Sequence, residues 1–179
     1  MKIMATIFLA AFFVALGSAQ DAPRDVPSAK SEERITKEVR HELLMLPYFG
    51  VFDNIAYKVN GGTVTLLGQV VRPSLKSDAE RAVKHIEGVD RVDNQIEVLP
   101  PSSSDDRIRR ALFRAIYRFP ALEKYSLGVQ KPIRIIVKNG HVTLEGVVDS
   151  QADKDMAGVR ANSVSGTFSV TNNLHVASS

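Results

Sequence analysis

The chain of 179 residues contains no cysteine and no tryptophan, and only 7% of its residues are aromatic. The absence of cysteine excludes disulfide bonds, a thiolate nucleophile and any metal site built on thiolates. It also excludes the covalent lipid anchor of bacterial lipoproteins, which is attached to a cysteine. Neither thiol chemistry nor a thiol-linked lipid can therefore take part in the function.

The sequence also lacks the usual signatures of catalysis and metal binding. No G-x-S-x-G motif is present, and adjacent carboxylates occur only at the two expected helix starts, where the helix dipole favours them. Four histidines occur in no i,i+4 pair and no recognisable ligand motif, so we expect them on the surface. We therefore predict no catalytic residues, no cofactor, no metal site and no enzymatic activity. The histidines are His41, His85, His141 and His175.

An apolar stretch close to the N-terminus has the form of an export signal. Lys2 precedes the apolar residues 3–16, and small residues up to Ala19 stand before Gln20. This stretch is too short to span a bilayer as a helix. We expect residues 1–19 to be a signal peptide cleaved after Ala19, and residues 20–31 to be a flexible polar leader. The mature chain is then exported without a transmembrane helix, with the periplasm as the expected compartment and secretion beyond it as the alternative.

An internal duplication is the most informative positive feature. Residues 54–71 (NIAYKVNGGTVTLLGQVV) and 132–149 (PIRIIVKNGHVTLEGVVD) share apolar and glycine positions at a constant offset of 78 residues. An earlier pair of segments matches at an offset of 73 residues, so the second copy carries five extra residues. The matched pairs include Ile35/Ile108, Val59/Val137, Gly62/Gly140, Leu66/Leu144, Gly68/Gly146 and Asn94/Asn172.

Each repeat has the pattern helix, strand, strand, helix, strand. Apolar residues at helical spacing open the unit and stop at a proline, Pro47 or Pro120. Two alternating segments follow, joined at Asn-Gly sequences for which we expect type I′ hairpin turns. In the second copy Gly158 is expected to shorten or loosen the later helix. The pattern predicts an α+β fold of two tandem αββαβ domains, each with a three-stranded mixed sheet and two helices on one face.

Each repeat resembles a BON domain. The residues that carry the resemblance are VNGGTVTLLG (59–68) with GVDRVDN (88–94), and their counterparts VKNGHVTLEG (137–146) with GTFSVTN (166–172). BON domains occur in osmotically inducible periplasmic proteins and in outer-membrane-associated factors. The resemblance implies two BON domains, an envelope location linked to osmotic stress, binding of phospholipid or of an envelope partner, and no enzymatic activity. The expected ranges are 32–99 for the first domain, 100–104 for the linker and 105–177 for the second domain.

Positive charge is concentrated in the second repeat. Residues 32–98 carry nine Lys/Arg against eleven Asp/Glu, whereas residues 105–176 carry eleven against seven. On the expected helix from Asp105 to Phe119, arginines gather in a sector of roughly 80°, opposite the apolar stripe and beside two aromatic residues. Such a surface suits an anionic bilayer. The candidate lipid- or partner-binding residues are Arg107, Arg110, Phe113, Arg114, Tyr117 and Arg118.

Three interpretations of this helix face stay open at this point. It can contact anionic phospholipid headgroups, form an interface with the other repeat or an envelope protein, or remain solvated. The first defines our hypothesis, a non-enzymatic periplasmic stress-associated protein that makes peripheral membrane contact through its second domain. The alternative is a protein-interaction or chaperone-like scaffold that uses the apolar residues Tyr48, Phe49, Val51 and Phe52, unless these form a lid over the first core.

Two further functions find little support in the sequence. Nucleic acid is not an expected partner, because the positive charge is local and no base-reading motif is present. A small-ligand or ion sensor would require a visible pocket signature or an oxygen-rich metal loop, and neither is apparent. The oligomeric state and the relative orientation of the two domains are not predicted.

Overall fold

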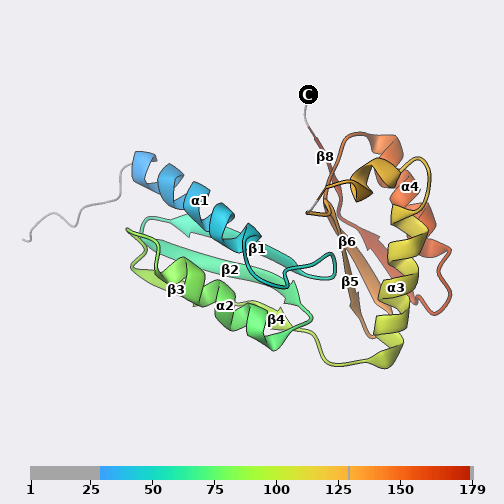
Figure 1. Cartoon of the computed structure of the whole chain (residues 1–179), viewed down its shortest axis with the longest axis horizontal. Helices are drawn as coiled ribbons and strands as arrows, with labels where there is room; N and C mark the ends of the chain where they lie inside the picture. The colour runs from blue at the N-terminus through green and yellow to red at the C-terminus, as the bar shows by residue number, and fades with distance from the viewer. Residues whose placement is uncertain (1–28, 129, 178–179) are drawn as a thin grey trace, which may run out of the picture.

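The computed structural model describes residues 29–128 and 130–177, in which the two repeats form two domains side by side (Figure 1). The predicted signal peptide and most of the predicted leader lie outside these residues. The first domain comprises α1 (Ala29–Leu44), β1 (Asn54–Asn60), β2 (Thr63–Val70), α2 (Pro73–Lys84), β3 (Arg91–Asn94) and β4 (Glu97–Val98). The second comprises α3 (Ser103–Tyr117), the 3-10 helix η1 (Glu123–Ser126), β5 (Ile133–Lys138), β6 (His141–Val148), α4 (Gln151–Asn162), β7 (Ser169–Asn172) and β8 (His175–Val176). The predicted α+β class with two tandem domains is confirmed.

Both domains build the same mixed sheet, with their two helices on one face (Figure 1). The first two strands of each domain pair antiparallel, and the second strand pairs in parallel with the third and fourth. The expected last strand is therefore divided into two short segments. An asparagine makes each break: Asn94 and Asn172 donate from Nδ2 to a helix carbonyl and accept with Oδ1 from the backbone N–H two residues on.

Each domain has its own core along the predicted apolar stripes. In the first domain the stripe of α1 is buried at Ile35, Val39 and Leu43. In the second, the stripe of α3 is buried at Ile108, Leu112 and Ile116. These positions have at most 5% of their surface exposed, so the repeat pattern of apolar residues identified the two cores.

The two hairpin turns differ, although both were predicted to be type I′. Asn139 and Gly140 have φ of 52° and 77°, as the type I′ turn requires at both central residues. In the first domain Asn60 pairs with Thr63, so the central residues are Gly61 and Gly62, and only Gly61, with φ of 58°, has a positive φ. The prediction is wrong there because the asparagine stands one position before the turn.

The helix starts also correct the sequence-based boundaries. α1 begins at Ala29, inside the expected leader, and α3 begins at Ser103, inside the expected linker. Ser102 is the N-cap of α3 and accepts from the Asp105 N–H at 3.1 Å. The expected shortening by Gly158 is absent, because α4 has 12 residues, as does α2. A Cβ on Gly158 would lie 3.0 Å from Asn172 Nδ2, so the glycine leaves room for the asparagine that ends the sheet strand.

The domains contact each other through residues 48–53, which join α1 to β1 and are called here the interdomain segment. The Val51 carbonyl accepts from the Ile135 N–H of the edge strand β5 at 2.9 Å. The Gly50 carbonyl accepts from Arg134 Nη1 at 2.9 Å, and the same guanidinium lies 4.5 Å from the ring centroid of Phe49. Burial lowers the pKa of Arg134. The interdomain segment is therefore part of the first domain in sequence and is also bonded to the second domain.

The predicted lid over the first core is only partly correct. Phe49 packs against the first core, whereas Val51 and Phe52 pack against the second. Tyr48 is 72% exposed and its ring lies under Arg72. The buried carboxylate of Asp53 accepts from the backbone N–H groups of Gly50 and Val71, and so holds the segment in this conformation.

Candidate functional site

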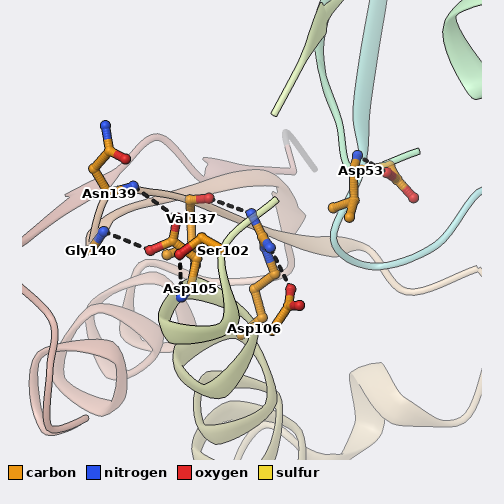
Figure 2. A network of polar contacts seen from close by, with 9 residues as sticks. Asp53, Ser102, Asp105, Asp106, Val137, Asn139 and Gly140 are labelled. Carbon is orange, nitrogen blue, oxygen red and sulfur yellow. Dashed lines mark hydrogen bonds and ion pairs between the residues drawn. The ribbon is translucent and has the colours of Figure 1, made fainter. Parts of the chain in front are cut away.

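Polar contacts at its N-terminal end hold helix α3 against the hairpin of the second domain (Figure 2). The buried carboxylate of Asp105 accepts from the backbone N–H groups of Asn139 and Gly140, each at 2.9 Å. Arg109 is 2% exposed and donates to the Val137 carbonyl at 2.6 Å and to Asp106 Oδ1 at 2.7 Å. These bonds fix the rotation of α3, and with it the direction in which the remaining arginines point.

Four of the five arginines of this region form one exposed face, called here the arginine ridge: Arg107, Arg110, Arg114 and Arg118. Within residues 29–128 and 130–177, none of their guanidinium groups has an ion pair or hydrogen bond. The predicted ridge is thus brought together on the solvent side of α3. Its four guanidinium groups make no ion pair in the described residues, which leaves them available to an anionic partner.

The prediction that Tyr117 borders this ridge is wrong. Its side chain is 2% exposed, its hydroxyl donates to the Ile133 carbonyl at 2.6 Å, and the same oxygen accepts from the Ile133 N–H at 3.1 Å. Burial raises the pKa of this hydroxyl. The edge of β5 lies against that flank of α3 and draws Tyr117 into the core. In this conformation the side chain cannot contact a bilayer.

Phe113 is half-buried and makes the contact between repeats that the sequence left open. Its ring lies edge-on to Phe52 of the first domain, with centroids 6.4 Å apart, and 5.0 Å from the ring of Tyr117. The first domain therefore reaches the flank of the arginine ridge. An interface of this helix face with the other repeat was one of the three interpretations that the sequence left open, but its partner residue Phe52 was not predicted.

A small hollow opens where Phe52 and Phe113 meet the ridge. It has a volume of about 280 Å³ and is called here the aromatic notch. Its floor is apolar and comes from both domains, whereas its rim is cationic and comes from α3. The lining residues are Val51, Phe52, Arg110, Phe113, Arg114 and Arg118. On the other flank of the ridge, Arg107, Arg110 and Arg114 border a second hollow of about 600 Å³ with Ser104 and Ser165.

A larger hollow than either of these lies in the first domain, between α1 and α2. It has a volume of about 830 Å³, and its lining includes Met45, Leu46 and Ala82. At the position equivalent to Ala82 the second domain has Arg160, which donates to the Ala115 carbonyl at 3.1 Å and lies 4.8 Å from the ring centroid of Phe119. The arginine bridges the two helices there, so the groove between helices is a property of the first domain.

Neither a metal centre nor a membrane span is found in the part of the chain that the structure describes. No group of three or more His, Asp or Glu side chains there is placed to hold a metal ion. No helix within those residues is long and apolar enough to cross a bilayer. The four histidines are exposed, as predicted.

The two repeats, with their αββαβ order and paired core positions, agree with a comparison against known families, in which the model of the BON domain matches residues 31–100 and 104–178. The chain belongs to the BON domain family. BON domains are associated with envelope and membrane-related proteins, and the family is generally non-enzymatic. No curated protein matches the chain.

Two solved structures resemble this pair of BON domains at low identity. Both are of CdsD, described as a structural protein of the type III secretion system of Chlamydia trachomatis. The first, a C-terminal domain, is 12% identical, with 79% of this chain and 96% of that chain covered and a TM-score of 0.32. The second is also 12% identical, with 80% and 93% covered and a TM-score of 0.29. At these TM-scores neither likeness informs the function.

Proposed function

We propose that this protein is a non-enzymatic envelope protein that binds anionic phospholipid surfaces reversibly through α3 of its second BON domain. The observation that supports the proposal is the arginine ridge, with four exposed guanidinium groups that have no acidic partner in the described residues. Each arginine near an anionic membrane contributes about 1 kcal/mol. Four of them contribute on the order of 4 kcal/mol at low salt, which suits peripheral contact and weakens as salt screens the charges.

The location follows from the same proposal. Residues 1–19 act as a signal peptide, residues 20–31 as a leader, and the two domains at 32–99 and 105–177 reach the periplasm, where the arginine ridge faces anionic headgroups. The association of BON domains with envelope proteins supports this placement.

Vesicle flotation tests the proposal. The mature chain from Gln20 should float with phosphatidylglycerol-containing vesicles, but not with phosphatidylcholine vesicles, and moderate salt should reduce the floating fraction. The triple variant Arg110→Ser, Arg114→Ser, Arg118→Ser should lose flotation while its thermal melt stays unchanged, because the three side chains are exposed and make no described bonds.

A matched control distinguishes the effect of the arginine ridge from the effect of lowering the net charge of the protein. The variant Arg40→Ser, Lys58→Ser, Lys84→Ser removes three exposed positive charges from the first domain, none of them in a described ion pair. It should float as the unmodified chain does. Equal loss of flotation in both triple variants, or unchanged flotation of the α3 variant, would contradict the assignment to α3.

A protein-interaction scaffold is the second candidate, and the groove between α1 and α2 favours it. Met45 is 68% exposed at this groove, and exposed apolar side chains beside a groove are typical of protein contacts. Absence of flotation under all conditions, together with capture of an envelope protein that Met45→Glu abolishes, would support this function instead.

A further inference from the structure

The aromatic notch combines an apolar surface and a cationic surface, and neither domain alone provides the complete notch. Phe52 comes from the first domain and Phe113 from the second, and the two rings meet edge-on. Both side chains are only partly buried and line the same hollow. Arg110, Arg114 and Arg118 form its rim. An apolar floor and a cationic rim therefore lie within one small site.

The position of Phe52 relative to α3 is held by the backbone on either side of it. Val51 accepts from the Ile135 N–H at 2.9 Å, and Gly50 accepts from Arg134 Nη1 at 2.9 Å. On the other side, the Asp53 carboxylate accepts from the Val71 N–H at 2.8 Å. The notch is thus preformed and requires no ordering of a loop when a ligand enters, which lowers the entropic cost of binding.

The chemistry of the notch indicates the occupant. A ligand that satisfies it has an apolar part that packs on Phe52 and Phe113 and an anionic group for the unpaired guanidinium groups at the rim. Its volume of about 280 Å³ is below the usual 300–1,000 Å³ of sites that enclose a whole small molecule. It therefore accommodates a segment of a chain rather than an entire amphiphile. An anionic phospholipid in a bilayer presents both groups side by side.

We propose that the aromatic notch is the apolar subsite of the membrane-binding surface, and that the two domains build it together. The upper part of an acyl chain lies in the hollow against Phe52 and Phe113, while Arg110, Arg114 and Arg118 bind the phosphate of the same or a neighbouring lipid. This inference rests on the proposed function. It adds that the first domain takes part directly in membrane binding, through Phe52.

Because the chain contains no tryptophan, a single introduced indole reports on the notch without background. The variant Phe52→Trp is mixed with phosphatidylglycerol vesicles, with or without bromine on the acyl chains close to the ester. We expect a blue shift of the emission with both vesicles and loss of fluorescence with the brominated ones only. A thermal melt confirms that the variant is folded.

Phe168→Trp is the matched control. Phe168 is 78% exposed and lies beside His141, against the hairpin that holds the N-terminal end of α3, whereas the notch lies further along the helix. As it does not line the notch, its indole should show neither the blue shift nor the loss of fluorescence. Comparable loss of fluorescence at both positions would indicate general proximity to the bilayer and would overturn the assignment of a specific subsite.

A second variant separates the apolar contribution from the electrostatic one. Phe52→Ser should weaken vesicle binding about tenfold, as expected for loss of one buried aromatic contact, and leave the salt dependence unchanged. The triple arginine variant should instead remove the salt-dependent part. Unaltered affinity of a folded Phe52→Ser variant would overturn the inference.

The remaining outcomes distinguish this inference from the proposed function. If the unmodified chain floats and Phe52→Trp stays unquenched, the subsite is wrong and the proposed function stands. If the unmodified chain does not float, the proposed function fails and the inference fails with it. Loss of Phe52→Trp fluorescence with monomeric brominated fatty acid, but not with brominated vesicles, would assign the notch to a free anionic amphiphile and overturn the membrane assignment.

Discussion

Helices α1 and α3 occupy equivalent places in the two domains, but their exposed charged side chains differ in whether they form ion pairs. On α1, Arg34 pairs with Glu38 at 2.9 Å and Lys37 with Glu33 at 2.8 Å. The exposed arginines of α3 have no such partners in the residues that the structure describes. The buried stripes of the two helices are nearly the same. The core face of the helix is thus shared by the two repeats, whereas the solvent faces differ, ion-paired on α1 and without ion pairs at the exposed arginines of α3.

The first strands of the two domains diverge in a related way. At the free edge of β5, the Tyr117 hydroxyl bonds both backbone groups of Ile133, Val51 accepts from Ile135, and Arg109 donates to Val137. The backbone groups along the corresponding edge of β1 have no described bond from outside its sheet. Its large apolar side chains are half-buried, whereas those of β5 are fully buried. The second domain is therefore closed at an edge that the first leaves open. The half-buried residues are Ile55, Tyr57 and Val59.

The largest effect on this comparison is expected from Tyr117→Phe. Removing the hydroxyl leaves the buried N–H and C=O of Ile133 without their partner, so we expect the free energy of unfolding to fall by about 2–3 kcal/mol. Tyr57→Phe in the first domain removes one half-buried bond, to the Thr36 carbonyl at 3.1 Å, and should cost about 1 kcal/mol or less. Urea denaturation of both variants measures the difference. Equal losses would show that closing the edge of β5 adds no stability.

A smaller, pH-dependent effect is expected at Asp153, which stands where the first domain has the buried Leu75. The Asp153 carboxylate binds Lys124 Nζ at 2.9 Å and accepts from the Tyr125 hydroxyl at 2.8 Å. The ion pair with Lys124 is the main reason that the pKa of Asp153 is lowered. Because the folded state holds the carboxylate ionised, its contribution to stability is complete near neutral pH and is lost as the pH falls below about 4.

Thermal melts of Asp153→Asn across pH test this contribution. The variant should melt roughly 3 °C below the unmodified chain at pH 7, and the difference between the two melting temperatures should narrow as the pH falls below about 4. A constant difference at all pH values would indicate that packing, and not the charge of Asp153, stabilises this part of the second domain.

The smallest effect on stability is expected from substitutions at Arg160 and Ala82, the equivalent residues that differ between the helix pairs of the two domains. Arg160→Ala removes the bond to the Ala115 carbonyl and the contact with Phe119, and should lower the free energy of unfolding by about 0.5–1 kcal/mol. The reverse change, Ala82→Arg, places the longer side chain in the open groove of the first domain and should alter stability by less than about 0.5 kcal/mol. Chemical denaturation checks both. A large loss for Ala82→Arg would show that the groove of the first domain cannot receive the bridging arginine.

The sequence predicted the features that repeat and missed those that depend on contacts between segments far apart in the chain. Paired apolar positions identified both cores and the αββαβ order, because burial on one face imposes a periodic pattern. A helical projection could not predict the burial of Tyr117. The projection puts Tyr117 on nearly the same side of α3 as the exposed Arg110, but its side chain enters the core because the edge of β5 covers that flank. The contact of Phe52 with Phe113 was not predicted for the same reason, since no local pattern reports a contact with a residue about 60 positions away.

The bond between the Val51 carbonyl and the Ile135 N–H also has a consequence for solubility. β5 reads IRIIVK, a segment of high β-propensity, and a strand with an open edge can pair with copies of itself. One of the groups that occupies this edge comes from the other domain. Cutting the chain between the domains would free the Ile135 N–H and expose an isoleucine-rich edge, so the isolated second domain should aggregate more readily than the intact chain. The first domain thus protects the second from self-association.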